Sequence, residues 1–138
     1  MADLIHQSID VAAKPPAVYA FAEDPKIGQL FARAREIIDV AQNGGGRVKS
    51  CKTKNGTVEY LVHDFPQRFE AEYHWPGYRA HYNVRFEAMG DTTTRVSIDV
   101  NLQPQSFMGR VKASMTRMSV KGHINDRVAA IDKQFNKK

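Results

Sequence analysis

The sequence has little of what marks a secreted, membrane-spanning or disulfide-bonded protein. Only one of its 138 residues is a cysteine, Cys51, so no internal disulfide can form. It contains no run of about 18 apolar residues, which argues against a membrane-spanning helix. The opening segment, Met1 to His6, lacks the basic start and the apolar stretch of a signal peptide. Together these absences predict a cytoplasmic location.

Motifs for metal binding, phosphate binding and nucleophilic catalysis are also missing. The glycines 44–46 follow a predicted strand but open no helix, and no Lys-Ser or Lys-Thr pair follows them, so they indicate a hairpin turn. Cys51 lies inside a predicted strand without the surroundings of a nucleophile. We therefore predict no metal and no cofactor, and assign no catalytic residue. The histidines, which show no metal-ligand spacing, are His6, His63, His74, His81 and His123.

The composition is that of an ordinary globular domain. Hydrophobic residues make up 42% and charged residues 25%, which suits a single domain over residues 1–138. The net charge of +5 permits an anionic partner, but a solvated basic surface is the favoured interpretation. Transient contact with an anionic membrane stays open. Nucleic acid is disfavoured because the basic C-terminal segment lacks interleaved aromatic residues, and the oligomeric state is not predicted.

The hydrophobic period changes twice along the chain. Residues 5–11 alternate as a half-buried strand, and Pro15-Pro16 and Asp24-Pro25 then open two short helices. The second of these carries Ile27, Leu30, Phe31 and Ala34 at helical spacing. From Arg35 to Gln103 the period is two. The strands predicted there are Glu36–Ala41, Arg47–Thr53, Thr57–Asp64, Phe69–Trp75, Tyr78–Ala88 and Thr94–Gln103.

The last three predicted strands pair consistently. A two-residue loop at 76–77 places Ala71 opposite Tyr82, and a three-residue loop at 89–91 places the same Tyr82 opposite Ile98. On the other face, Glu72, His81 and Asp99 then share one row across three strands. Such a row can act as an acid–base group, but we interpret it as a surface charge ladder, since it lies opposite the aromatic face.

After Pro104 the period returns to 3.6 and predicts one long helix, Phe107 to Phe135. A bend or a close approach is expected at Gly122, where the apolar stripe shifts phase. The stripe comprises Met108, Val111, Met115, Met118, Gly122, Ile124, Val128, Ile131 and Phe135.

This order of elements resembles the SRPBCC superfamily, which includes START-like lipid-transfer domains, the birch pollen allergen family and the bacterial polyketide cyclase/dehydrase family. The resemblance is carried by the strand Ile5–Val11, the helix within Pro15–Pro25 and the closing helix Phe107–Phe135, and it spans nearly the whole chain. It implies the α+β helix-grip fold, β-α-α-β6-α. In that fold a curved seven-stranded antiparallel sheet surrounds the C-terminal helix and encloses an apolar cavity.

The resemblance also implies the function. We expect a carrier or binding protein for a hydrophobic small molecule, such as a lipid, a polyketide or an aromatic compound. The alternative is a polyketide cyclase/aromatase-like or dehydratase-like enzyme acting on such a ligand. Dry packing of the same side chains is the competing structural interpretation. Residues expected to line the cavity are Tyr60, Tyr73, Trp75, Tyr78, Tyr82, Phe86, Ile98, Met108, Met115 and Met118.

Overall fold

The computed structural model describes residues 3–24, 37–54 and 56–136. The second predicted helix, with Ile27, Leu30, Phe31 and Ala34, lies outside these residues. The described elements follow the predicted order. They are β1 (Asp3–Val11), α1 (Pro15–Glu23), β2 (Ile37–Gln42), β3 (Val48–Thr53), β4 (Thr57–Asp64), β5 (Arg68–Trp75), β6 (Tyr78–Ala88), β7 (Thr94–Pro104), α3 (Phe107–Val111) and α4 (Ala113–Phe135).

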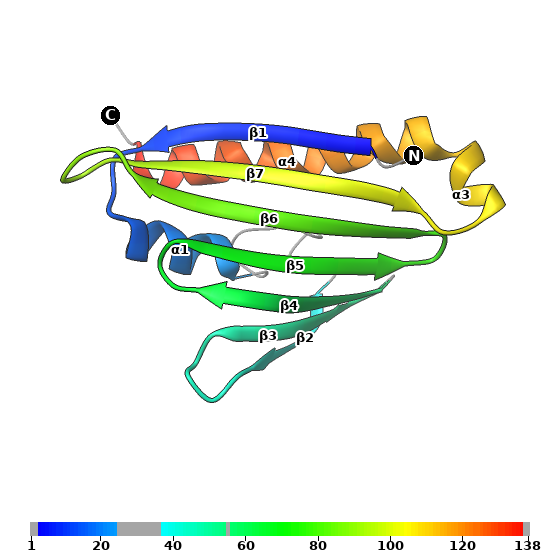
Figure 1. Cartoon of the computed structure of the whole chain (residues 1–138), viewed down its shortest axis with the longest axis horizontal. Coiled ribbons are helices and arrows are strands. Elements are labelled where there is room, and N and C mark those ends of the chain that lie inside the picture. The colour runs from blue at the N-terminus through cyan, green and yellow to red at the C-terminus, as the bar shows by residue number, and fades with distance from the viewer. Residues whose placement is uncertain (1–2, 25–36, 55, 137–138) are drawn as a thin grey trace.

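The strands form one antiparallel seven-stranded sheet in the order β1-β7-β6-β5-β4-β3-β2. Figure 1 shows the curved sheet, with α4 running along β1 and β7 and α1 near the left-hand ends of the middle strands. Helix α4 contacts β1 and β7, and α1 contacts β6 and α4. The predicted α+β helix-grip architecture is confirmed.

One face of the sheet is the buried inner face. The alternation expected for β5, β6 and β7 holds along each strand, because every second side chain is buried. Aromatic rings dominate this face on β5 and β6, whereas β7 contributes aliphatic side chains. The inner face thus places a continuous apolar surface opposite the helices.

The pairing of these strands was predicted correctly at one hairpin and wrongly at the next. Ala71 lies opposite Tyr82, as expected from a two-residue loop. Tyr82 lies opposite Val100 rather than Ile98, because Ala88 pairs with Thr94 and the loop spans residues 89–93. The amide of Met89 donates to the carbonyl of Thr93 inside this longer loop (2.9 Å). A shift of two residues keeps the same side chains on the inner face.

An irregularity in β4 brings two polar side chains to the inner face. The pairing with β5 shifts between Tyr60 and Val62, so Tyr60 lies opposite Ala71 and His63 opposite Phe69. Both of those partners are fully buried. In a regular strand, residues three apart point to opposite faces, whereas the extra residue of a bulge restores them to one side. The bulge therefore places the His63 side chain on the inner face together with Tyr60.

The single closing helix predicted for Phe107–Phe135 is two helices, since α3 ends at Val111 and α4 begins at Ala113. The break lies at Lys112 and not at Gly122, through which α4 continues. The close approach is at Gly109, where an added Cβ would lie 2.5 Å from the carbonyl oxygen of Gly77, whereas at Gly122 it would meet nothing within 4 Å. Helix α3 therefore packs directly against the β5–β6 turn. None of the helices in the described part of the chain is long and apolar enough to cross a membrane.

The two ends of the helical segment differ in what they bury. In α4 the inward face carries Val120, Ile124, Arg127 and Ile131, all at most 7% exposed. These positions follow the i, i+4, i+7, i+11 spacing of one helix face. The larger apolar residues before Val120 are exposed and do not lie on this face.

Candidate functional site

Most of the predicted cavity residues lie together on the inner face of the sheet. Trp75 is half-buried and stacks on Tyr78, with ring centroids 5.4 Å apart. The other sheet residues are buried, with exposures between 1% and 9%. They are Tyr60, Tyr73, Tyr78, Tyr82, Phe86 and Ile98.

Three of the tyrosine hydroxyls on this face already bond to protein groups. Tyr60 donates to the backbone carbonyl of Glu23 (2.6 Å), and the Tyr73 hydroxyl bonds that of Thr53 (3.1 Å). Tyr78 donates to the carbonyl of Gly109 in α3. These bonds fix the ring orientations, so the hydroxyls tie the sheet to α1 and α3.

The three methionines are not on the inner face, and the expectation that they face the sheet is wrong. Met108 is 57% exposed, Met115 75% and Met118 73%. Met118 precedes the buried Val120 by two residues, which at 3.6 residues per turn turns it about 200° away. The sequence predicts that the apolar stripe lies on one helix face. In the structure its first half is exposed and its second half is buried.

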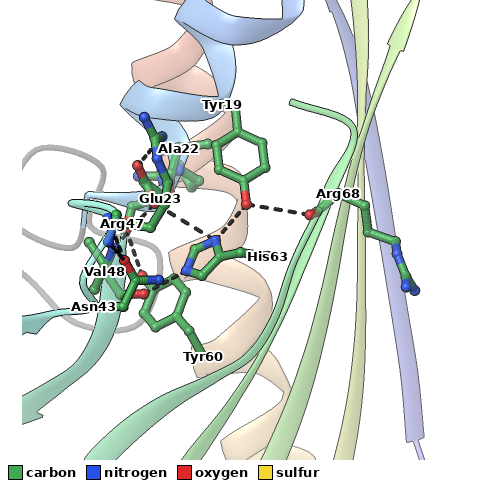
Figure 2. A network of polar contacts seen from close by, with 11 residues as sticks. Tyr19, Ala22, Glu23, Asn43, Arg47, Val48, Tyr60, His63 and Arg68 are labelled. Carbon is green, nitrogen blue, oxygen red and sulfur yellow. Dashed lines mark hydrogen bonds and ion pairs between the residues drawn. The ribbon is translucent and has the colours of Figure 1, made fainter. Parts of the chain in front are cut away.

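A buried polar cluster joins α1, the start of β3 and β4 at one end of the inner face (Figure 2). The Tyr19 hydroxyl lies 2.5 Å from Nδ1 of His63, and Nε2 of His63 lies 2.5 Å from the carbonyl oxygen of Val48. Because that carbonyl only accepts, Nε2 carries a proton, and Nδ1 of a neutral ring accepts from Tyr19. The Tyr19 hydroxyl also lies 3.4 Å from the carbonyl oxygen of Arg68. A protonated His63 can therefore donate to Tyr19 while Tyr19 donates to Arg68, so both charge states keep their bonds.

Glu23, the last residue of α1, is the acidic member of this cluster. Its Oε1 accepts from the Arg47 guanidinium (2.5 Å). Its Oε2 accepts from the Val48 amide (3.5 Å) and lies 3.9 Å from Nδ1 of His63. The Glu23 side chain is 8% exposed, whereas that of Arg47 is 30% exposed. Arg47 also covers the Phe65 ring at 4.1 Å, so it closes the cluster from the solvent side.

Burial shifts the acid–base properties of the cluster. It raises the pKa of Glu23, an effect that Arg47 opposes. Burial, followed by the nearby Glu23 carboxylate, raises the pKa of Tyr19 well above its usual range. The raised pKa values favour a neutral Tyr19 hydroxyl and make protonation of the Glu23 carboxylate less costly. In this arrangement the neutral Tyr19 hydroxyl is a hydrogen-bond partner of Nδ1 of His63.

Arg127 lies beside this cluster, on the buried face of α4. Its side chain is 0% exposed, and one Nη donates to the carbonyl of Ala22 at the end of α1. The guanidinium also lies 5.9 Å from the centre of the Phe21 ring. Its Nε and its other Nη have no hydrogen-bond partner among the described residues. Burial lowers the pKa of Arg127 to about 10, so the group stays charged at neutral pH.

Sequence reasoning missed four of these residues: Tyr19, Glu23, Arg47 and Arg127. Arg127 left a readable signal, because a charged side chain interrupts the apolar face of α4 between Ile124 and Ile131. The others left none, since a helix end and a hairpin turn meet only through the tertiary fold.

The charge ladder predicted on the outer face exists in altered form. His81 bonds Glu70 (2.8 Å) and lies 3.7 Å from Glu72. Asp99 pairs with His6 (2.5 Å) and Arg85 (2.7 Å) instead, because the β6–β7 pairing differs from the predicted one. These groups are partly exposed, so the ladder remains a surface feature. Among the described residues no three His, Cys, Asp or Glu side chains are placed to hold a metal ion.

Comparison with known proteins supports the fold and gives no sequence relative. No protein-family model and no curated protein matches this chain. A conserved protein from Geobacillus kaustophilus matches with a TM-score of 0.69 and 13% identity over 96% of this chain and 94% of its own. A START superfamily protein from Mycobacterium smegmatis gives 0.61 and 12% over 91% and 97%. Norcoclaurine synthase from Thalictrum flavum, solved with dopamine and hydroxybenzaldehyde, gives 0.63 and 9% over 100% and 90%.

Proposed function

We propose that this chain, a single domain with the helix-grip fold of the SRPBCC superfamily, binds a hydrophobic small molecule between the inner face of its sheet and α4. The protein acts as a carrier or binding protein in this proposal. The rings of β4, β5 and β6 supply apolar contact area. The hydroxyl of Tyr60 on β4 is held by α1, and that of Tyr78 on β6 is held by α3. A lipid, a polyketide or an aromatic compound has the required chemistry.

The observation that carries the proposal is the Arg127 guanidinium, buried with two nitrogen atoms unpaired. A buried donor without a partner costs about 1–3 kcal/mol, and more when it is charged. A ligand oxygen placed there removes that cost. Carboxylates form the strongest bonds with guanidinium groups. The ligand in this proposal is therefore an apolar molecule with one acidic or carbonyl end.

A pair of fluorescent polyene probes tests this proposal, one a fatty acid and the other its methyl ester. We expect the protein to bind both, with the acid at least about tenfold tighter, the gain of one charge-assisted hydrogen bond. Arg127→Met should remove the preference for the acid and leave ester binding unchanged. Arg79→Met, on the outer face of β6, is the matched control and should change neither. Failure of the native protein to bind either probe would contradict the proposal.

A second candidate function is catalysis of the cyclase or aromatase kind, favoured by one observation. Tyr19 and His63 form a buried hydrogen-bonded pair of an acid–base kind beside Arg127 and the aromatic face. Mass spectrometry of compounds that co-purify with the protein separates the two functions. A carrier and its Tyr19→Phe variant should hold the same compound. An enzyme's variant should hold a compound of different mass, because its substrate is no longer converted.

A further inference from the structure

The helical segment displays an outward apolar face that the proposed function does not use. Five large apolar side chains within twelve residues are between 57% and 77% exposed. They account for half of the large exposed hydrophobic residues in the described part of the chain. Single exposed apolar residues are common, but five in so short a segment are the kind of concentration found at interaction surfaces. This surface, called the methionine face below, consists of Phe107, Met108, Val111, Met115 and Met118.

The local structure holds the methionine face outward. Ser106 caps α3 by accepting from the Gly109 amide (3.0 Å), and Tyr78 donates to the Gly109 carbonyl. Gly109 itself is buried against the β5–β6 turn. Since Gly109 faces the sheet, the bulky neighbours on the other side of α3 cannot turn inward. Figure 1 shows α3 at one end of the molecule, beyond the end of β7.

The charge around the methionine face has one sign. Residues 100–125 contain Arg110, Lys112, Arg117 and Lys121 and no aspartate or glutamate. These four cations nearly match the net charge of +5 for the whole chain. No ion pair given by the described residues involves Arg110, Lys112 or Lys121. The basic residues stand beside the apolar ones, so the segment has an apolar face flanked by positive charge.

We propose that the methionine face docks the protein on the surface of an anionic membrane. Apolar side chains enter the boundary between headgroups and acyl chains, while Lys and Arg reach the lipid phosphates and carboxylates. A second copy of this chain fits less well, because a two-fold interface would bring the same four cations together. Nucleic acid fits less well too, since Phe107 is the one aromatic residue of the face. The proposal does not depend on any ligand of the inner face.

Flotation with lipid vesicles tests this docking. We expect binding to vesicles of phosphatidylcholine with 30% phosphatidylserine, little binding to pure phosphatidylcholine, and loss of binding at high salt. Met115→Gln with Met118→Gln should lower the partition coefficient at least about tenfold. Lys112→Gln and Lys121→Gln should each lower it about fivefold.

Matched controls separate docking from general stickiness. Met89→Gln removes an exposed methionine from the β6–β7 loop, and Lys52→Gln removes an exposed lysine from β3. Both should bind vesicles like the native protein, and circular dichroism should show all variants folded. Equal binding to neutral and anionic vesicles would overturn the proposal, as would native binding by the double methionine variant. A concentration-dependent dimer that the methionine variant abolishes would identify a second copy as the occupant and overturn it as well.

Discussion

The two ends of the C-terminal helical segment are equally apolar in sequence and opposite in structure. From Val120 onward the large apolar residues of α4 are buried or half-buried, whereas those from Phe107 to Met118 are exposed to water. The inward positions of the first part are small or polar, with Gly109 buried and Thr116 half-buried. Close approach to the β5–β6 turn leaves no room there for large side chains. Burial in the folded chain therefore explains why the residues from Val120 onward are apolar. It does not explain why those from Phe107 to Met118 are apolar.

The largest expected difference between the two ends is in stability. Ile124→Ala removes a fully buried side chain and should lower the free energy of unfolding by about 2–5 kcal/mol. Met118→Ala removes a side chain that is 73% exposed and should change it by less than about 0.5 kcal/mol. Urea unfolding of both variants measures the two values. Similar losses would show that Met118 packs against the protein, and the comparison would fail.

The glycines provide a sharper test at the same two ends. In Gly109→Ala the new Cβ would lie 2.5 Å from the Gly77 carbonyl oxygen, so α3 must shift. We expect a loss of about 1–3 kcal/mol. Gly122→Ala meets nothing within 4 Å and should stabilise α4 by up to about 1 kcal/mol through helix propensity. Thermal unfolding distinguishes the opposite signs, and a gain of stability in Gly109→Ala would disprove the anchoring of α3.

The fold was predictable because its signals are local and repeated. Period-two runs define β5, β6 and β7, and the two-residue loop at 76–77 sets the β5–β6 pairing. The β6–β7 pairing was missed because the loop uses five residues instead of three, and an even shift leaves the hydrophobic pattern unchanged. Periodicity alone cannot tell such registers apart.

The candidate site was predictable only in part. Aromatic residues of the inner face follow from strand alternation, so the burial of Tyr73, Tyr82 and Phe86 on that face is as predicted. Their role in lining a cavity stays a prediction. The polar cluster depends on a bulge after Tyr60 and on contacts between segments distant in sequence, such as Glu23 with Arg47. The methionines were misplaced because a stripe specifies a helix face but not the partner of that face.

Replacing Arg127 shows whether this buried guanidinium on α4 is needed for the stability of the fold. Arg127→Met keeps most of the volume and removes a buried charge with two unpaired nitrogen atoms. The bond to the Ala22 carbonyl is lost as well. We expect the ligand-free protein to keep its stability or gain up to about 1 kcal/mol. Calorimetry at neutral pH measures this, and a loss above about 2 kcal/mol would mean that the guanidinium serves the fold.

The smallest expected effect is a pH dependence that arises in the polar cluster beside the buried end of α4. Burial raises the pKa of Glu23 in the folded chain above the ordinary value of 4.5 that the unfolded chain retains. Between these two values the folded chain holds a proton that the unfolded chain has released, so stability falls as pH rises. This contribution is fully present below 4.5 and is lost as pH passes the raised folded value.

Glu23→Gln cannot titrate and should flatten the slope measured by urea unfolding across this range. Arg47→Met should steepen it, because Arg47 opposes the effect of burial. Lys112→Gln, at the exposed end, should leave the slope unchanged. A native slope of the opposite sign that Glu23→Gln removes would show that the Arg47 ion pair outweighs burial.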